Sequence, residues 1–155
     1  MAAYLLGTHA LVELVRRLPS PVKKWADGIP TTDQIYISVV SIGQIQAEID
    51  RLPSSDPAKP LWQAHFRAAL ATFSPSYVLG VDEAIAMRWA TLLPLTLTTT
   101  DKSGQQVAVA ADSRLVLATA MERNLIVVDS IEHCHVALAA HGLRSYDPDT
   151  GTSLP

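Results

Sequence analysis

The turn Gly7–His9 is the first place in the chain where reactive side chains could gather. A short apolar run, Tyr4–Leu6, predicts a buried strand before it, and apolar residues with helical spacing follow from Leu11 to Val15. Thr8 is expected to cap that helix through its hydroxyl. Open α/β folds place their chemistry beyond the carboxyl ends of their strands. At this end the chain offers His9, but neither a carboxylate nor a glycine-rich phosphate loop.

A second group of reactive side chains, His133, Cys134 and His135, lies near the end of the chain. Imidazole and thiolate ligands suit zinc or copper. Together with His9 and Asp112, these residues make one hypothesis for a metal site. Against it, His133 and His135 are two positions apart on a predicted helix and therefore face different ways. Ordinary structural roles are the favoured interpretation.

Strands and helices that must position these residues alternate along the chain. We expect buried strands at residues 4–6, 35–40, 77–79, 125–128 and 143–146. We expect helices over residues 8–18, 41–49, 61–73, 82–93, 105–123 and 130–140, with a short one from Pro21 towards Trp25. Buried strands without polar alternation favour a parallel sheet covered on both faces. The predicted fold class is therefore α/β, with a single domain over residues 1–155.

Three local patterns refine this outline. Ser41 and Gln44 have the S-x-x-Q spacing of a capping box, which predicts that a helix begins there. In this interpretation Gln44 does the same local job as a glutamate, and only the charge is lost. The polar stretch Pro94–Gly104 predicts a mobile loop, and Asp147–Pro155 predicts a tail.

Composition and charge narrow the class of protein. The chain has 155 residues, 48% of them hydrophobic and 17% charged, so one core of ordinary size is expected and the apolar excess allows a homodimer. The net charge of −3 argues against a basic nucleic-acid binder, unless Arg16, Arg17, Lys23 and Lys24 form a local patch rather than solvated helix ends. The single cysteine, Cys134, excludes an internal disulfide. With no transmembrane run and no export signal, we expect a cytoplasmic protein.

Five segments follow one another in an order shared with a known family. LLGTHALVEL matches an opening of the form L-L-D-T-N-V-L-S-E-L, YISVVSIGQ matches Y-L-S-x-I-T-x-A-E, LGVDEAIA matches L-x-x-D-E-x-x-A, ADSRLVLATAMERNLIVVD matches A-D-x-x-I-A-A-T-A-x-x-x-x-L-x-L-V-T, and GLRSYDP matches G-L-R-x-x-N-P. On these motifs the chain resembles PIN-domain proteins, in particular the VapC-like toxins of bacterial toxin–antitoxin pairs. The resemblance implies a three-layer α/β/α fold with a parallel sheet of four to five strands.

The same resemblance implies a chemistry, namely cleavage of RNA with Mg²⁺ or Mn²⁺ held by three or four carboxylates. The aspartate of the first strand corresponds to Gly7, which supplies no ligand. The polar residue two positions later corresponds to His9, a poor partner for Mg²⁺. The helix glutamate corresponds to Gln44, whose amide oxygen brings no charge.

The later carboxylates of the family are only partly matched. An ungapped match places Ser113 at the third acidic position, and Asp112 one residue earlier, turned by about 100° on a helix. A local shift in register would restore Asp112. The fourth acid falls near Asp129, which stands where the family usually has threonine or serine. Asp112 and Asp129 are therefore the only candidate metal ligands, and Gly7, His9, Gln44 and Ser113 are vestigial positions.

The expected function follows from these losses. We expect a degenerate VapC-like protein that lacks effective nuclease activity and retains binding to RNA or to an antitoxin-like protein. The alternative is a weak or atypical Mg²⁺- or Mn²⁺-dependent ribonuclease that uses Asp112 and Asp129. A third possibility is a structural dimer that has lost both roles. No cofactor is expected unless activity persists, and no membrane partner is expected.

Overall fold

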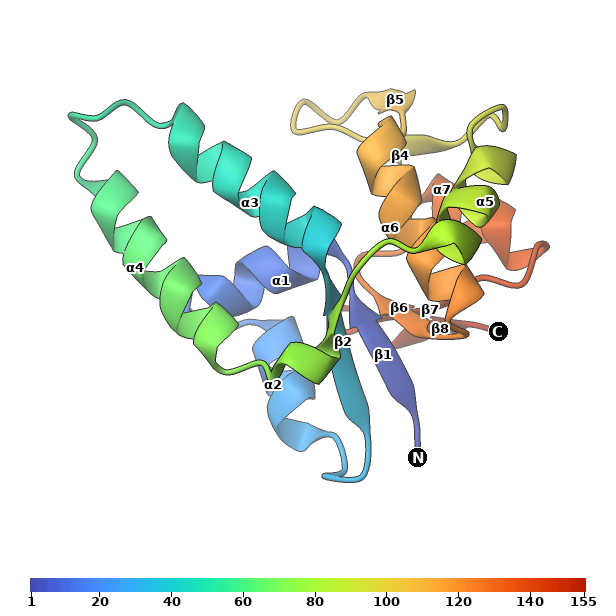
Figure 1. The fold of residues 1–155 in the computed structure, drawn as a ribbon, viewed down its shortest axis with the longest axis horizontal. Helices are drawn as coiled ribbons and strands as arrows, with labels where there is room; N and C mark the ends of the chain where they lie inside the picture. The colour runs from blue at the N-terminus through green and yellow to red at the C-terminus, as the bar shows by residue number, and fades with distance from the viewer.

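A six-stranded sheet forms the centre of the molecule. The computed structural model describes residues 1–155, and the strands lie in the order β3-β2-β1-β6-β7-β8 (Figure 1). Their bounds are β1 Ala3–Leu6, β2 Gln34–Ser38, β3 Val78–Leu79, β6 Ile126–Val128, β7 Arg144–Asp147 and β8 Thr152–Leu154. Every pair of neighbours is parallel except β7 and β8. The predicted fold class is confirmed, with one strand more than expected.

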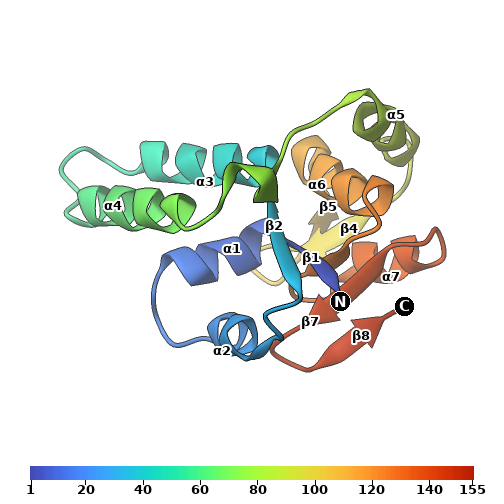
Figure 2. The same ribbon diagram turned by 60° about the horizontal axis from the view of Figure 1, so that its bottom comes forward.

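Helices cover both faces of this sheet, as Figure 2 shows. One face carries α1 Thr8–Val15, α2 Pro21–Gly28, α3 Val39–Arg51 and α4 Ala58–Ala71. The other face carries α5 Glu83–Leu92, α6 Ala111–Glu122 and α7 His133–Ala139. A short 3₁₀ turn, Pro75–Tyr77, leads into β3. None of these helices is long and apolar enough to cross a membrane.

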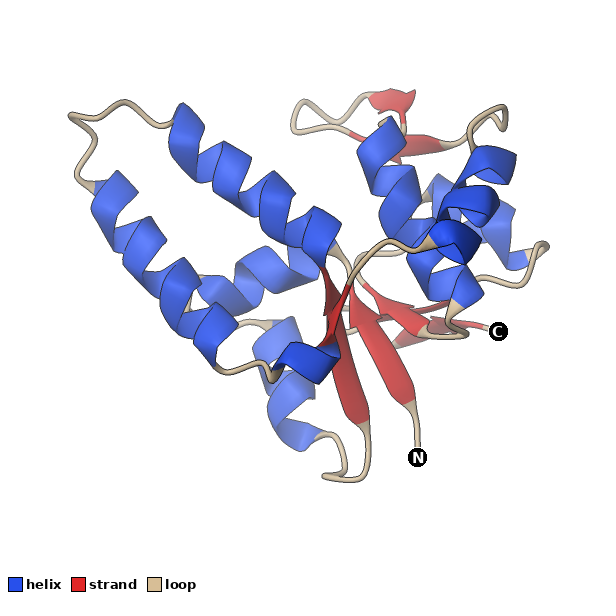
Figure 3. Cartoon of the chain, viewed as in Figure 1, coloured by secondary structure: helices blue, strands red, loops and turns tan.

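Strand pleating divides the interior into two cores. Leu6 and Val128 are fully buried with α1 to α4, whereas Leu5 and Val127 pack with α5 to α7. Successive strand residues point to opposite faces, so continuous apolar runs are what a sheet covered on both sides requires. The secondary structure is coloured in Figure 3.

Two helix starts differ from the sequence-based expectation. Gly7, rather than Thr8, is the N-cap of α1, and it makes no side-chain cap bond. The helix α3 begins at Val39, because the hydroxyl of Ser38 accepts the N–H of Val40 at 3.1 Å and caps the helix three residues early. The predicted capping box is therefore wrong, and Gln44 lies in the second turn of α3, free for other contacts.

Residues 94–110 also differ from the prediction. The strands β4 Thr98–Thr100 and β5 Gln106–Ala108 pair as a separate antiparallel hairpin, and α6 begins only at Ala111. The buried guanidinium of Arg114 donates to four carbonyl oxygens, those of Leu92, Leu93, Leu95 and Val109. These bonds hold the residues before the hairpin, 92–95, and the residue after it, Val109, against α6.

The predicted tail is likewise only partly correct. Residues Thr152–Leu154 form β8, an antiparallel edge strand on β7. Asp147 makes the connecting turn, because its Oδ1 accepts the N–H of Asp149 at 2.9 Å and its carbonyl accepts the N–H of Gly151 at 2.8 Å. Gly151 has a positive φ of 71°, which glycine adopts without strain.

Candidate functional site

The candidate site lies where β1 and β6 end beside the first turns of α1 and α6. Residue 7 follows β1, Asp129 follows β6, and Asp112 lies in the first turn of α6. Gln44 reaches the same edge from α3. The structure thus brings the sequence-predicted residues to one edge of the sheet, but it divides them into two separate contact groups.

The first group is a close approach of Asp129 to Gly7. A Cβ atom built on Gly7 would lie 2.0 Å from Oδ2 and 2.9 Å from Cβ of Asp129. Backbone bonds fix both residues, because Gly7 N–H donates to Val128 O at 2.9 Å and Asp129 N–H donates to Tyr146 O at 3.1 Å. Gly7 has an ordinary φ of −64°, so the absent side chain makes room for a neighbour rather than for an unusual turn. The carboxylate of Asp129 occupies the space that a side chain at position 7 would need.

The second group is a chain of hydrogen bonds from α1 through α3 to α6. Thr8 Oγ1 donates to Gln44 Oε1 at 2.5 Å, and it also lies 2.8 Å from Ser41 Oγ. Gln44 Nε2 donates to Asp112 Oδ2 at 2.9 Å and to Ser113 Oγ at 3.3 Å. Both ends of the Gln44 amide are therefore occupied by protein partners. Asp112 and Ser113 both accept from the Gln44 amide. The structure therefore does not select one of them as the match for the family's third acidic position.

His9 joins the first group from the surface. Its Nδ1 lies 3.6 Å from Asp129 Oδ1 and 3.8 Å from Glu13 Oε1, while its own side chain is 66% exposed. Contact with Asp129 raises the pKa of His9 above its ordinary value, and Glu13 adds to this effect although partial burial opposes it. The His9 imidazole therefore lies beside a carboxylate that favours its protonated form.

An acidic pocket opens next to His9. It has a volume of about 250 Å³. Its lining residues are His9, Glu13, Pro21, Val22, Asp129, Ser130, Asp147, Pro148 and Asp149, with no lysine or arginine among them. Glu13 Oε2 is buried without a hydrogen-bond partner. Four carboxylates and one histidine make this acidic pocket complementary to a positively charged group.

The donor set fits a divalent metal ion poorly. Mg²⁺ requires near-octahedral oxygen ligands, usually with one or two carboxylates directed at it. The chain contains no group of three or more histidine, cysteine, aspartate or glutamate side chains arranged to hold a metal ion. Gln44 directs an N–H donor, not a lone pair, at Asp112. The Gln44 amide and the backbone N–H of Ser113 supply partners for the Asp112 carboxylate without a cation.

The structure does not gather the residues of the zinc or copper hypothesis into one metal-holding group. Burial raises the pKa of the Cys134 thiol to about 11, which disfavours its thiolate form in the absence of a metal ion. Burial lowers the pKa of His135, and its Nδ1 accepts the N–H of Glu132 at 3.0 Å. His133 is exposed and forms no cluster with them. Glu132 and His135 form the capping box at the start of α7.

Two of the four residues of the basic patch considered from the sequence are engaged in local contacts. Lys23 pairs with Asp27 at 2.5 Å, and the guanidinium of Arg16 lies over the Trp62 ring, 4.9 Å from its centroid. The sequence-based reasoning missed Thr8, Ser41 and Glu13 as residues of the site. Only Glu13 had a local signal, since it lies four residues after His9 and therefore on the same helix face.

Comparisons with known proteins place this fold. No family model matches the chain, and no curated protein sequence matches it either. Among solved structures, VapBC2 from Rickettsia felis, bound to a DNA fragment from its promoter, is similar with a TM-score of 0.69 and 14% identity over 94% of this chain and 98% of that chain. FitAcB from Neisseria gonorrhoeae gives a TM-score of 0.69 and 20% identity over 94% and 97%. DNA-bound VapBC from Salmonella typhimurium gives 0.64 and 16% over 96% and 99%. The chain therefore has the PIN-domain fold of VapC toxins, as its sequence motifs predicted.

Proposed function

We propose that this protein is a toxin–antitoxin-type PIN protein that has lost effective nuclease activity and acts by binding an antitoxin-like protein. The observation that carries the proposal is the hydrogen bond from Gln44 Nε2 to Asp112 Oδ2 at 2.9 Å. A glutamate at position 44 would place a second carboxylate oxygen at that distance from Asp112, and like charges so close repel unless a cation lies between them. The amide removes the repulsion without a cation.

Asp129 supports the same proposal from the other side of the site. Its carboxylate fills the space above Gly7, so an aspartate side chain cannot be accommodated there without displacing Asp129. Its Oδ1 already accepts the N–H of Ser130 at 3.0 Å and faces His9. With glycine at position 7 and glutamine at position 44, Asp129 and Asp112 each have partners within the protein.

An RNA cleavage assay with Mn²⁺ tests the loss of activity. We expect no cleavage above the metal-free background with the wild-type protein or with Asp112→Ala. Metal-dependent cleavage that is lost in Asp112→Ala would overturn the proposal. Asp56→Ala serves as a control, because it removes a carboxylate from the loop between α3 and α4, which has no contact with the site.

One observation favours a weak ribonuclease as the second candidate function. The carboxylate of Asp129 lies where a side chain at position 7 would be, so a negatively charged oxygen is still present at the end of β1. With Asp112, it would give two carboxylates for Mg²⁺ or Mn²⁺ and leave Gln44 as a neutral ligand. This function requires the Gln44 amide to rotate away from Asp112, and the cleavage assay above distinguishes it.

The acidic pocket favours a protein partner over RNA. Its four carboxylates repel phosphates in the absence of a metal ion, whereas a lysine or arginine side chain would pair with them and satisfy the buried Glu13 oxygen. Several similar structures were solved as toxin–antitoxin complexes, some with DNA. A basic segment of an antitoxin-like protein is therefore the partner that the pocket's charge supports.

Co-expression with the protein encoded directly upstream tests this partner. We expect a stable complex that weakens with rising salt and that Asp149→Lys weakens by about tenfold or more, since one charge-assisted contact becomes repulsive. Glu83→Lys, an equal charge change on exposed α5, should leave binding unchanged. Equal binding by both variants would contradict the assignment of the pocket.

We also propose that the protein forms a homodimer. Large apolar side chains are exposed on several helices, with Met87 66%, Leu61 56% and Val136 56% exposed. Size-exclusion chromatography with light scattering should give about twice the chain mass of 16.7 kDa.

A further inference from the structure

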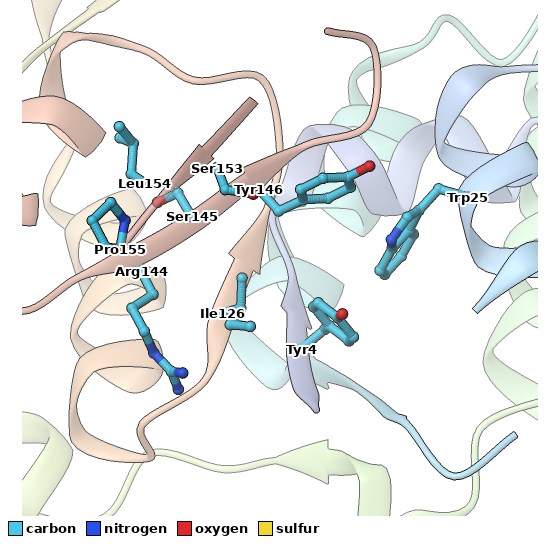
Figure 4. Close-up of a pocket in the computed structure, with 9 residues that line it drawn as sticks. All are labelled: Tyr4, Trp25, Ile126, Arg144, Ser145, Tyr146, Ser153, Leu154 and Pro155. Carbon is cyan, nitrogen blue, oxygen red and sulfur yellow. The ribbon is translucent and has the colours of Figure 1, made fainter. Parts of the chain in front are cut away.

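A second hollow, the aromatic hollow, lies on one face of the sheet towards the amino ends of its strands. Its volume is about 460 Å³, and it is lined by Tyr4, Trp25, Ile126, Arg144, Ser145, Tyr146, Ser153, Leu154 and Pro155 (Figure 4). Tyr4 pairs with Ile126 across β1 and β6, and Ile126 pairs with Arg144 across β6 and β7. These side chains therefore stand next to one another on three adjacent strands. The hollow shares no lining residue with the acidic pocket.

Aromatic side chains form one end of this hollow, as Figure 4 shows. The Tyr4 and Trp25 rings meet edge to face with centroids 5.0 Å apart, and Trp25 lies 6.1 Å from Tyr146. The hydroxyls of both tyrosines and the indole N–H make no hydrogen bond within the protein, in contrast to those of Tyr36 and Trp89. Burial raises the pKa of Tyr4, which keeps its hydroxyl a donor at neutral pH.

Arg144 forms the other end, with Ile126 between it and the aromatic rings (Figure 4). Its Nη2 donates to Asn124 O at 2.6 Å and to Asn124 Oδ1 at 3.1 Å, which fixes the guanidinium in place. None of the ion pairs in the chain involves Arg144. It is the only charged side chain in the lining, and no carboxylate lies within ion-pair distance of its guanidinium.

We propose that the aromatic hollow binds one mononucleotide, with the base against Tyr4 and Trp25 and the phosphate on Arg144. A planar guanidinium with free N–H groups matches phosphate oxygens, and aromatic rings stack or pack against any base. The unpaired phenol and indole donors suit the acceptor atoms of a base or ribose. The volume falls within the range of small-ligand sites.

Other occupants fit the aromatic hollow less well. A cation in an aromatic cage would face the positive charge of Arg144, and a purely apolar side chain would leave the donors unpaired. A long RNA would gain little beyond one nucleotide unit, because the chain has a net charge of −3 and its other pocket is acidic. The inference does not depend on the proposed loss of nuclease activity or on the antitoxin partner.

Calorimetric titration of the whole protein with adenosine 5′-monophosphate tests the inference. We expect saturable binding, and binding at least about tenfold weaker for adenosine, which lacks the phosphate, and for ribose 5-phosphate, which lacks the base. No binding of the nucleotide at millimolar concentration would overturn the proposal. Equal binding of adenosine would overturn the role of Arg144 as the phosphate contact, and with it the assignment.

Variants locate the binding. Arg144→Gln should weaken nucleotide binding by about tenfold or more while keeping a donor for Asn124, and Arg67→Gln, on exposed α4, should not. Trp25→Leu should weaken binding with Trp62→Leu as its matched control, and thermal melts show whether each variant folds. If Trp25→Leu fails to fold, Arg144→Gln still tests whether the nucleotide binds in the aromatic hollow. Wild-type affinity in Arg144→Gln would contradict the site.

An RNA octamer distinguishes a free nucleotide from a nucleotide within RNA. We expect it to bind within about threefold of the mononucleotide, because only one unit is held and few phosphates are neutralised. Binding about a hundredfold tighter, with a steep salt dependence, would overturn the mononucleotide assignment in favour of an RNA groove.

Discussion

The acidic pocket and the aromatic hollow both border β6 and β7 and differ in charge and in the side chains that line them. At each of β1, β6 and β7, a residue that lines the hollow is followed three positions later by a residue at the carboxyl edge of the sheet, and in two of the three cases that residue is an aspartate of the acidic pocket. These pairs are Tyr4 and Gly7, Ile126 and Asp129, and Arg144 and Asp147. Three strand residues span only about 10 Å. Two sites of opposite charge can therefore lie close together on one parallel sheet.

The contrast also concerns the hydrogen bonds that each region makes within the protein. At the carboxyl edge of the sheet, Gln44 accepts a hydrogen bond from Thr8 and donates one to Asp112, and Asp129 packs on Gly7. In the aromatic hollow the donors of Tyr4, Trp25 and Tyr146 lack partners. The Gln44 network, at the edge where α/β folds place their chemistry, is closed by internal bonds, whereas the aromatic hollow keeps unused donors.

The largest expected effect comes from Gly7→Asp. The new side chain overlaps the Asp129 carboxylate and adds a like charge, so we expect a loss of about 3 kcal/mol or more in the free energy of unfolding. The double variant Gly7→Asp with Asp129→Gly should recover much of this loss. Urea unfolding measures both effects.

Gly43→Ala is the matched control for the Gly7 variant. A Cβ on Gly43 meets nothing within 4 Å, and in the interior of α3 an alanine should raise stability by about 0.5–1 kcal/mol. Additive effects of the Gly7 and Asp129 substitutions would contradict the close approach of the two residues.

Gln44→Glu should give the next largest effect. It replaces the N–H donor facing Asp112 by a carboxylate oxygen, and we expect a loss of about 1–3 kcal/mol in metal-free buffer. Mn²⁺ should restore part of that stability, because a cation then screens the paired carboxylates. Gln105→Glu, at an exposed position outside the site, should neither lose stability in metal-free buffer nor gain stability with Mn²⁺. Unchanged stability of Gln44→Glu would show that the amide is not needed there.

Thr8→Val should cost about 1 kcal/mol, because it removes the hydroxyl that joins Ser41 to Gln44. Ser41 is fully buried and would lose its partner. Thermal unfolding measures the loss, and Thr91→Val, whose hydroxyl bonds only its own helix at Arg88 O, serves as the control. Equal losses in the two variants would indicate a local helix effect rather than the network.

The smallest effects concern histidine titration, which NMR can follow. Asp129 raises the pKa of His9, and burial lowers that of His135. His9 therefore stabilises the fold below its unfolded pKa of about 6.5, and this contribution is lost as pH rises through its raised folded value. His135 behaves oppositely, since its stabilising contribution is full above about 6.5 and is lost as pH falls towards its lowered folded value.

Asp129→Asn should lower the pKa of His9 and leave that of His135 on the low side. Because the His9 side chain is 66% exposed, its contribution to stability should stay under about 0.5 kcal/mol. A His9 pKa that does not change in this variant would contradict the ion pair.

The fold was predictable because strands buried on both faces are short continuous apolar runs, which can be recognised from the local sequence. Val127 and Val128, for example, face different cores, and both must be apolar. The β4–β5 hairpin was missed because three-residue strands outside the main sheet leave too little periodicity to detect.

The sequence predicted which residues lie at the site, but not which atoms contact one another there. Gln44 was assigned to a capping box because Ser41 lies three residues before it. In the structure, however, Ser38 is the N-cap of α3. The space that Asp129 takes from residue 7 is a contact between neighbouring strands over a long sequence separation, which no local pattern records. Whether Asp112 and Asp129 hold a metal stays a prediction.

Titration of Mn²⁺, followed by the loss of the free ion's electron paramagnetic resonance signal, tests the central claim most directly. If Gln44 takes the place of the cation, wild-type protein and Asp112→Ala should both leave millimolar Mn²⁺ essentially free, while Gln44→Glu gains measurable binding. Stoichiometric binding of Mn²⁺ by the wild-type protein, abolished in Asp112→Ala, would contradict the account.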